Sequence, residues 1–291
     1  MNKIKVILGV VVLNILFGTS FPIIKTILIY FTPKEWCFIR VVLYTLVLCL
    51  WVGRKLWSYP LELRDFFWLI LGALSGMLVN QISFVEGLHR TSPAHSAIIS
   101  TTIPLWAMLL ATFFLKEKMR LSHLFGLIAG ILGVAILLEL DHGFQASPYL
   151  NGDLLSLLNA IAYSIFLVIS RKHLSRMNPM ISLTLMSLFA LIGTGFYSSW
   201  DFPLDKLKSL PLSVDFMILY AIIVLSIVTF LICLWTLRHM EASKASFFVL
   251  IQPIVAAVLS FLMQAEVPSH RFYVSTCLIF AGIILGNLKR S

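Results

Sequence analysis

Five side-chain amides interrupt the long apolar stretches of this chain, and they are its clearest candidates for binding chemistry. They are Asn14, Asn80, Gln81, Asn159 and Gln252. An amide in an apolar environment costs on the order of several kcal/mol without a hydrogen-bond partner, so each must face a neighbouring helix or a wet cavity. Hydrogen bonding between helices, at about 0.6–2 kcal/mol, explains any one of them. Their similar depth favours at least two of them as substrate ligands.

Two prolines and three aromatic residues are candidates for the same pathway. Pro104 and Pro253 lie near the centres of their apolar stretches, where proline removes a backbone donor and bends a helix. Such a bend is either a static kink or a hinge that exposes backbone polarity. Trp106, Tyr163 and Trp235 either stack on a ligand or pack between helices.

Three charged residues lie inside apolar stretches, towards the expected outer surface. Lys25 either snorkels to that surface or contributes to an outer gate. Arg40 and Glu86 fall at comparable depth, and each alone would be an isolated charge, so we expect them to pair. The pair is either structural or part of a gate or proton-coupling site. A nearby lone histidine, His95, is a weak metal ligand, and we interpret it as surface or interface polarity.

Motifs for catalysis and nucleotide hydrolysis are absent from the sequence. It contains no GxxxxGK[ST] phosphate loop, no HExxH and no GxSxG. The four cysteines, at positions 37, 49, 233 and 277, have no clustered spacing. We therefore expect a protein that is not an enzyme and that holds neither a cofactor nor a metal.

The composition places these residues in a membrane. Charged residues make up 12% of the 291 positions, against about 25% in a soluble domain, and mean hydropathy is +0.96. So much apolar surface needs lipid as well as a protein interior. The net charge of +9 sits in short gaps between apolar stretches, which is typical of topology determinants rather than a phosphate-binding face. A soluble enzyme, a nucleic-acid-binding module and a disordered chain are excluded.

Ten stretches are long enough to span a bilayer. Their approximate bounds are 6–27, 35–53, 66–88, 93–115, 121–140, 152–173, 179–198, 214–236, 242–264 and 268–288. With the N-terminus inside, 15 Lys and Arg fall in inner loops or termini and 5 in outer loops, as the positive-inside rule requires. We expect a multi-pass protein of the cell (inner or plasma) membrane with both termini cytoplasmic.

The second half of the chain repeats the first. An offset of 149 positions aligns Pro104 with Pro253, Asn80 with Thr229, and Glu117 with Glu266; Asn14 aligns with Asn159 at 145. Because a repeat of five helices is odd, the second copy must enter the membrane in the opposite orientation. We expect an all-α bundle of two inverted five-helix repeats, residues 1–146 and 147–291, the architecture of secondary transporters.

Several of these segments resemble one known family. Residues 17–25 (FGTSFPIIK) are similar to the first-helix signature of EamA-type members of the drug/metabolite transporter superfamily, and Arg40 in FIRVV resembles their second-helix arginine. Leu71–Leu138 and Asn151–Leu288 are similar to the rest of the two repeats. The resemblance implies ten helices around a central cavity, and export or exchange of small metabolites such as amino acids without ATP hydrolysis. Glu86 departs from the family, which usually has a small apolar residue there.

The expected function is therefore secondary transport by alternating access, with a membrane-embedded enzyme or lipid-handling protein (flippase or transferase) as the alternative. We expect a small-molecule substrate near the bilayer midplane, close to Asn14, Asn80, Pro104, Tyr163, Thr229 and Pro253. The absence of a central carboxylate favours neutral, zwitterionic or anionic substrates, and leaves facilitator, exchanger and proton antiporter open. Besides the lipid bilayer, a homodimer packed through glycine stripes is the partner that the sequence leaves open.

Overall fold

The computed structural model describes residues 3–56, 59–115, 149–264 and 270–287, with a few helical positions between 125 and 136. These residues form helices joined by short turns, and the described part contains no strand. In the first half the elements are α1 (Lys3–Ile27), α2 (Pro33–Val52), the 3-10 turn η1 (Gly53–Leu56), α3 (Leu63–Ala73), the π-helical turn η2 (Leu74–Val79), α4 (Asn80–Arg90), α5 (Pro93–Ser100) and α6 (Ile103–Leu115).

The second half follows a similar order. Its elements are α8 (Leu150–Lys172), the 3-10 turn η4 (Leu174–Arg176), α9 (Pro179–Ser198), α10 (Leu204–Lys208), α11 (Leu212–Ile222), the π-helical turn η5 (Ile223–Val228), α12 (Thr229–His239), α13 (Ala242–Ser246), the 3-10 turn η6 (Phe247–Leu250), α14 (Ile251–Gln264) and α15 (His270–Asn287).

Helix starts follow from local sequence. Thr32, Ser92 and Asn178 each precede a proline, and each side-chain oxygen accepts a hydrogen bond from a backbone N–H of the first turn. Thr32 forms a full capping box, because Glu35 also accepts from the Thr32 N–H at 2.8 Å. A polar cap satisfies an otherwise unpaired donor, and proline at the first position loses nothing there. Two of these helices therefore begin at the expected residues, 93 and 179, and α2 begins two residues before the expected 35.

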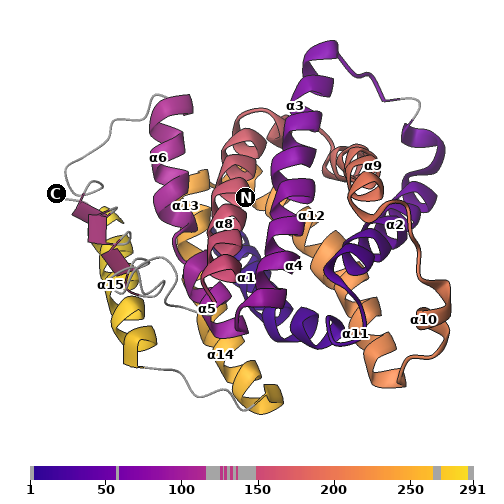
Figure 1. Cartoon of the computed structure of the whole chain (residues 1–291). Coiled ribbons are helices and arrows are strands. Elements are labelled where there is room, and N and C mark those ends of the chain that lie inside the picture. The colour runs from indigo at the N-terminus through magenta and orange to yellow at the C-terminus, as the bar shows by residue number, and fades with distance from the viewer. Residues whose placement is uncertain are drawn as a thin grey trace.

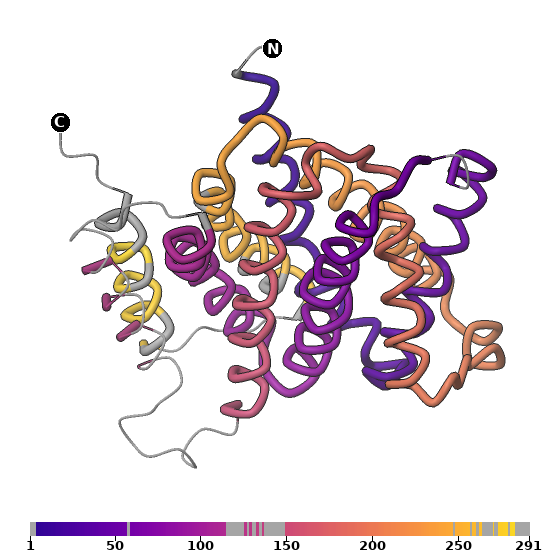
Figure 2. Tube along the Cα trace, turned by 90° about the horizontal axis from the view of Figure 1, so that it is seen from above, coloured from indigo at the N-terminus to yellow at the C-terminus, as the bar shows by residue number. Residues whose placement is uncertain are grey.

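The helices pack in two related sets. α1 packs on α14 and α12, α8 packs on α6 and α4, and α2 packs on α9. Figures 1 and 2 show α1, α4, α8 and α12 in the middle of the bundle, α2 and α9 on one side, and α15 at the opposite periphery beside α6. Large apolar side chains on the outside, such as Leu50, Trp51 and Phe113, are more than two-thirds exposed, as lipid contact requires.

Seven helices in the described part are long and apolar enough to cross a membrane, and the chain is an integral membrane protein. The expected span at 121–140 lies outside the described residues except for a few helical positions. The expected span at 242–264 is divided into α13, η6 and α14, where a 3-10 turn precedes Pro253.

The offset of 149 positions found in the sequence recurs in the helix bounds. Leu63–Arg90 and Leu212–His239 are both 28-residue helices, and their first and last residues differ by 149 positions. Their π-helical turns, Leu74–Val79 and Ile223–Val228, differ by the same offset. A π-helical turn is rare and often lies at a functional site. Both halves therefore carry the same irregularity at the same place.

Candidate functional site

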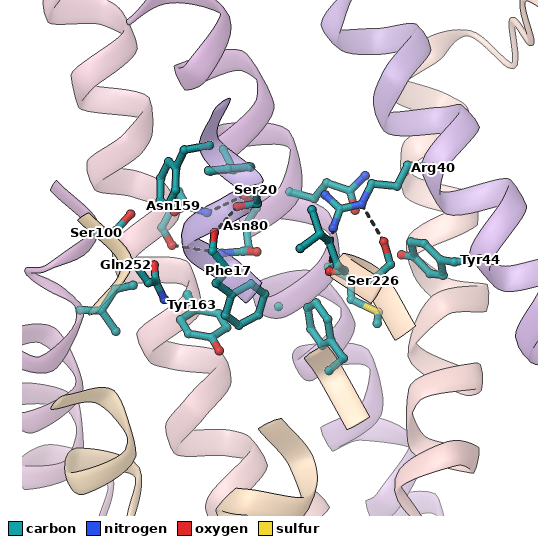
Figure 3. A pocket seen from close by; sticks show the side chains of 18 residues that line it. Phe17, Ser20, Arg40, Tyr44, Asn80, Ser100, Asn159, Tyr163, Ser226 and Gln252 are labelled. Atoms are coloured by element: carbon teal, nitrogen blue, oxygen red, sulfur yellow. Dashed lines mark hydrogen bonds between the residues drawn. The ribbon is translucent and has the colours of Figure 1, made fainter. Parts of the chain in front are cut away.

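A central cavity of about 740 Å³, which includes space open to solvent, lies between helices of both halves (Figure 3). Its polar lining consists of Ser20, Arg40, Tyr44, Asn80, Gln81, Ser100, Asn159, Tyr163, Ser226 and Gln252. Its apolar lining consists of Phe17, Phe21, Gly76, Met77, Phe84, Ile103, Leu225 and Phe230. Six residues singled out in the sequence are therefore brought together here: Arg40, Asn80, Gln81, Asn159, Tyr163 and Gln252.

Asn80 and Asn159 tie α4 to α8 at the cavity wall. Asn159 Nδ2 donates to the Asn80 carbonyl at 2.9 Å, and Asn80 Nδ2 donates to the Asn159 carbonyl at 3.3 Å. Neither side-chain oxygen has a hydrogen-bond partner among the described residues. The two asparagines thus join the helices and are also candidate substrate ligands, because their side-chain oxygens can still accept hydrogen bonds from a bound molecule.

Asn14 does not line the central cavity. It lines a smaller cavity nearer the N-terminal end of α1, and this cavity shares Tyr163 with the central one. Gln252 Nε2 donates to Asn14 Oδ1 at 2.8 Å, and Tyr163 Oη lies 3.5 Å from Cys233 Sγ. These two contacts, one joining α1 to α14 and one joining α8 to α12, mark the boundary between the cavities.

Arg40 does not pair with Glu86, so that expectation is wrong. Arg40 Nε donates to Ser226 Oγ at 2.8 Å, and Nη2 donates to the Leu225 carbonyl at 3.1 Å. Glu86 instead accepts from Arg90 Nη2 at 2.7 Å and from the Tyr197 hydroxyl. The two side chains lie on different helices, and the rotation of each helix gives each one a nearer partner.

The π-helical turn η5 explains how a backbone carbonyl becomes available to Arg40. The Thr229 N–H bonds to Val224 O, five residues back, whereas an α-helix would use Leu225 O. Leu225 O accepts from Arg40 and from Thr229 Oγ1, the latter at 2.9 Å. Thr229 is fully buried and does not line the cavity, contrary to expectation, because its hydroxyl is turned back onto this turn.

The two prolines lie at helix breaks beside the cavity. α5 ends at Ser100 and α6 begins at Ile103, so Pro104 is in the first turn of a new helix. Pro253 is likewise in the first turn of α14, after the 3-10 turn η6. Both prolines are buried, and the residue before each one, Ile103 or Gln252, lines the cavity.

Trp106 and Trp235 lie away from the cavity. Trp106 Nε1 donates to Thr102 Oγ1 at 3.2 Å within its own helix segment. Trp235 contacts His239, with ring centroids 5.3 Å apart, and fills the space beside Gly9, where an added Cβ would meet the Trp235 ring at 2.7 Å. Both are packing residues.

A second polar cluster lies at the far end of α4, and its central residue is one that sequence reasoning missed. Asp153 is fully buried, accepts from the Thr91 hydroxyl and lies 3.2 Å from His95 Nδ1. Lys25 Nζ donates to the carbonyls of Leu88 and Thr91, each at 2.7 Å. His95 is therefore a partner of a buried carboxylate rather than surface polarity. The sequence signal that could have indicated it is an acidic residue in the first turn of a spanning helix.

Close backbone contact makes this cluster possible. A Cβ added to Gly152 would lie 2.7 Å from the Thr91 nitrogen and 2.9 Å from the Gly87 carbonyl oxygen. Only glycine allows α8 to begin this close to the end of α4. The next residue, Asp153, is thereby placed against Thr91 and His95.

Comparisons with known proteins match nearly the whole chain to one family model. The model of the EamA-like transporter family matches residues 4–139 and 150–288. YyaM of Bacillus subtilis (strain 168), an uncharacterized transporter, is 22% identical over 99% of this chain and 95% of its own. YetK of the same organism, also an uncharacterized transporter, is 23% identical over 86% of this chain and 75% of its own. A solved crystal structure has a similar fold, with a TM-score of 0.62 and 18% identity over 98% of this chain and 97% of its own.

Proposed function

This chain belongs to the EamA-like transporter family, and we propose that it is a secondary transporter that carries small metabolites, as exporter or exchanger, by alternating access at the central cavity. The observation that carries the proposal is the cavity itself. It holds amides, hydroxyls and one guanidinium, all within helices that are apolar on their outer surfaces. Polar groups that line a cavity inside a membrane protein provide a place for a solute that the bilayer excludes.

We further propose ten helices in two inverted repeats, residues 1–146 and 147–291. Supporting this, the family model matches the chain twice, and the two π-containing helices share the offset of 149 positions. The cavity takes its lining from both halves, as expected for a site between repeats. Rocking of one repeat against the other would then expose the same residues first to one side and then to the other.

The two contacts at the boundary between the cavities form the proposed gate on one side of the central cavity. If the N-terminus is cytoplasmic, as the Lys and Arg distribution favours, Asn14–Gln252 and Tyr163–Cys233 lie on the cytoplasmic side of the cavity. Lys25, Asp153 and His95 would then lie on the outer side. Opening towards the cytoplasm has to separate α1 from α14 and α8 from α12.

Cysteine accessibility tests the proposal. In a variant whose four native cysteines are replaced, Ser100→Cys should react with a membrane-impermeant thiol reagent applied from either face of oriented vesicles. Ser187→Cys is the matched control, because Ser187 is equally buried but lies outside the central cavity, and it should not react. Labelling of Ser100→Cys from one face only, under every condition that supports exchange, would contradict alternating access.

A further inference from the structure

The guanidinium of Arg40 lacks an acidic partner inside the cavity. Arg40 is 8% exposed, and the two groups that accept its hydrogen bonds, Ser226 Oγ and the Leu225 carbonyl, are both neutral. Its second amino group, Nη1, has no acceptor among the described residues. None of the 18 residues that line the cavity is Asp or Glu. The cavity therefore has a buried positive charge that no carboxylate in its lining neutralises.

We propose that the transported molecule is a small organic anion, and that its carboxylate binds Arg40 as the missing counter-ion. This inference rests on the proposed function and assigns its substrate class. A buried charge is unfavourable unless it is paired. Arginine binds carboxylates through parallel N–H donors, and such charge-assisted hydrogen bonds are about twice as strong as neutral ones. The N–H of Nε and one N–H of Nη2 hold the guanidinium in place, and both N–H groups of Nη1 are free to bind a carboxylate.

The cavity is poorly suited to a cation or to an amino-acid ammonium group. The acidic side chains of the lining helices α2, α4 and α8 are already engaged: Glu35 with Lys206 and the Thr32 N–H, Glu86 with Arg90 and Tyr197, and Asp153 with Thr91 and His95. None of the three lines the cavity. An ammonium group would meet the Arg40 charge without a carboxylate to offset it, whereas a carboxylate would be attracted to it.

The opposite wall indicates what the rest of the molecule is like. Figure 3 shows Arg40, Ser226 and Tyr44 at one side of the cavity, and Ser100, Asn159 and Gln252 at the other. Phe17 meets Tyr163 edge-on, with ring centroids 6.0 Å apart, and Phe21 meets Phe84 at 5.3 Å. An anion with an aromatic or branched apolar body would place its carboxylate on Arg40 and its body against these rings.

A matched set of three probes tests the charge preference. 3-Phenylpropanoate, phenylalanine and 2-phenylethylamine share a phenyl ring and a two-carbon chain but are an anion, a zwitterion and a cation. We expect 3-phenylpropanoate to raise the melting temperature of the purified protein and to show counterflow in reconstituted vesicles, beyond protein-free vesicles. The amine should do neither. Stabilisation by the amine or by phenylalanine, but not by the anion, would overturn the inference.

Two arginine variants separate charge recognition from structural support. Arg40→Gln should weaken binding of 3-phenylpropanoate about thirtyfold or more, and Arg40→Lys should restore part of it. Arg171→Gln is the matched control, since Arg171 Nη1 also donates to a backbone carbonyl, that of Leu237 in α12 at 2.6 Å, but lies outside the central cavity. It should leave binding unchanged. If Arg40→Gln does not fold, Arg40→Lys must still lower affinity for the anion, and unchanged affinity would sink the inference.

The failures of the two proposals look different. Counterflow of phenylalanine with no response to the anion would retain a transporter and discard the anionic substrate. If the anion binds but Ser100→Cys is labelled from one face only, Arg40 is an anion site in a protein that does not alternate. Binding of none of the three probes would reject the anion proposal, while labelling of Ser100→Cys would still report on alternating access.

Discussion

Asn14 and Gln252 are 238 positions apart in the chain, yet Gln252 Nε2 donates to Asn14 Oδ1 at 2.8 Å in the middle of the bundle. The bond joins the first helix to α14 of the second half. It lies between the central cavity, which Gln252 lines, and the smaller cavity, which Asn14 lines. Because Asn14 Nδ2 also donates to Val10 O at 2.8 Å, the Asn14 amide is held in one orientation.

Replacing Asn14 with Leu should favour the conformation in which the central cavity is open towards the cytoplasm. The change removes one interhelical hydrogen bond worth about 0.6–2 kcal/mol, which shifts a two-state equilibrium by about 3- to 30-fold. We expect faster cytoplasmic-side labelling of Ser100→Cys in this variant. Thr45→Val is the control, because Thr45 Oγ1 bonds to Ser187 O between α2 and α9, away from the cavity. If Thr45→Val accelerates labelling as much as Asn14→Leu does, the faster labelling reflects a general loss of helix packing and contradicts the prediction.

Asn80 and Thr229 should differ in what they contribute, although they occupy matching positions in the two halves. Asn80→Leu removes an amide that lines the cavity and leaves the Asn159 carbonyl without its donor. We expect a loss of substrate binding together with a fall in stability of about 0.6–2 kcal/mol. Thr229→Val removes a buried hydroxyl outside the cavity, so only stability should fall. Binding isotherms and melting curves of both variants decide this.

Asp153→Asn should destabilise the protein without altering the central cavity. The buried carboxylate accepts from the Thr91 hydroxyl and contacts His95 Nδ1, and an amide in its place turns one acceptor into a donor. We expect a loss of about 1–3 kcal/mol, the usual cost of a buried mismatched polar group. The fully exposed Asp205 supplies the control, Asp205→Asn. Equal melting temperatures for the two variants would show that the Asp153 cluster contributes nothing to stability.

His173 should make stability fall on acidification. It follows α8 directly, outside the spanning residues 150–172, and stacks on Trp68 with ring centroids 3.5 Å apart. Burial, and after it repulsion from Lys172 and two nearby arginines, lowers the pKa of His173 to about 4 from its usual 6.5. Between these two values the unfolded chain binds a proton that the folded protein does not.

The contribution of His173 is therefore present above about pH 6.5 and is lost as the pH falls towards 4. His173→Gln cannot take up this proton, so its melting temperature should depend less on pH across that window than that of the wild type. Melting curves at several values from pH 7.5 to 4.5 measure the difference. Parallel curves for both proteins would refute the prediction.

The sequence by itself determined that this is a helical membrane protein and identified six of the ten polar residues that line the cavity. Asn80, Gln81, Asn159 and Gln252 were predictable, because amides in apolar helices must meet one another or a wet space. The offset of 149 positions that aligns the two halves of the sequence reappears in the bounds of two 28-residue helices. Pro104 and Pro253 predicted bends inside two spans, because proline removes a backbone donor, and the structure has helix breaks there.

Only the tertiary structure decided where each polar side chain points. Each residue turns an α-helix by about 100°, so the π-helical turn before Thr229 changes the direction in which the Thr229 side chain points. The sequence pattern does not reveal this turn. The similar depth of Arg40 and Glu86 predicted that they pair, but the rotation of α2 relative to η5 makes Ser226 the hydrogen-bond partner of Arg40 instead. Asp153 meets His95 because two glycine-lined backbones touch. Depth is a property of one helix, whereas a contact depends on how two helices are rotated and packed.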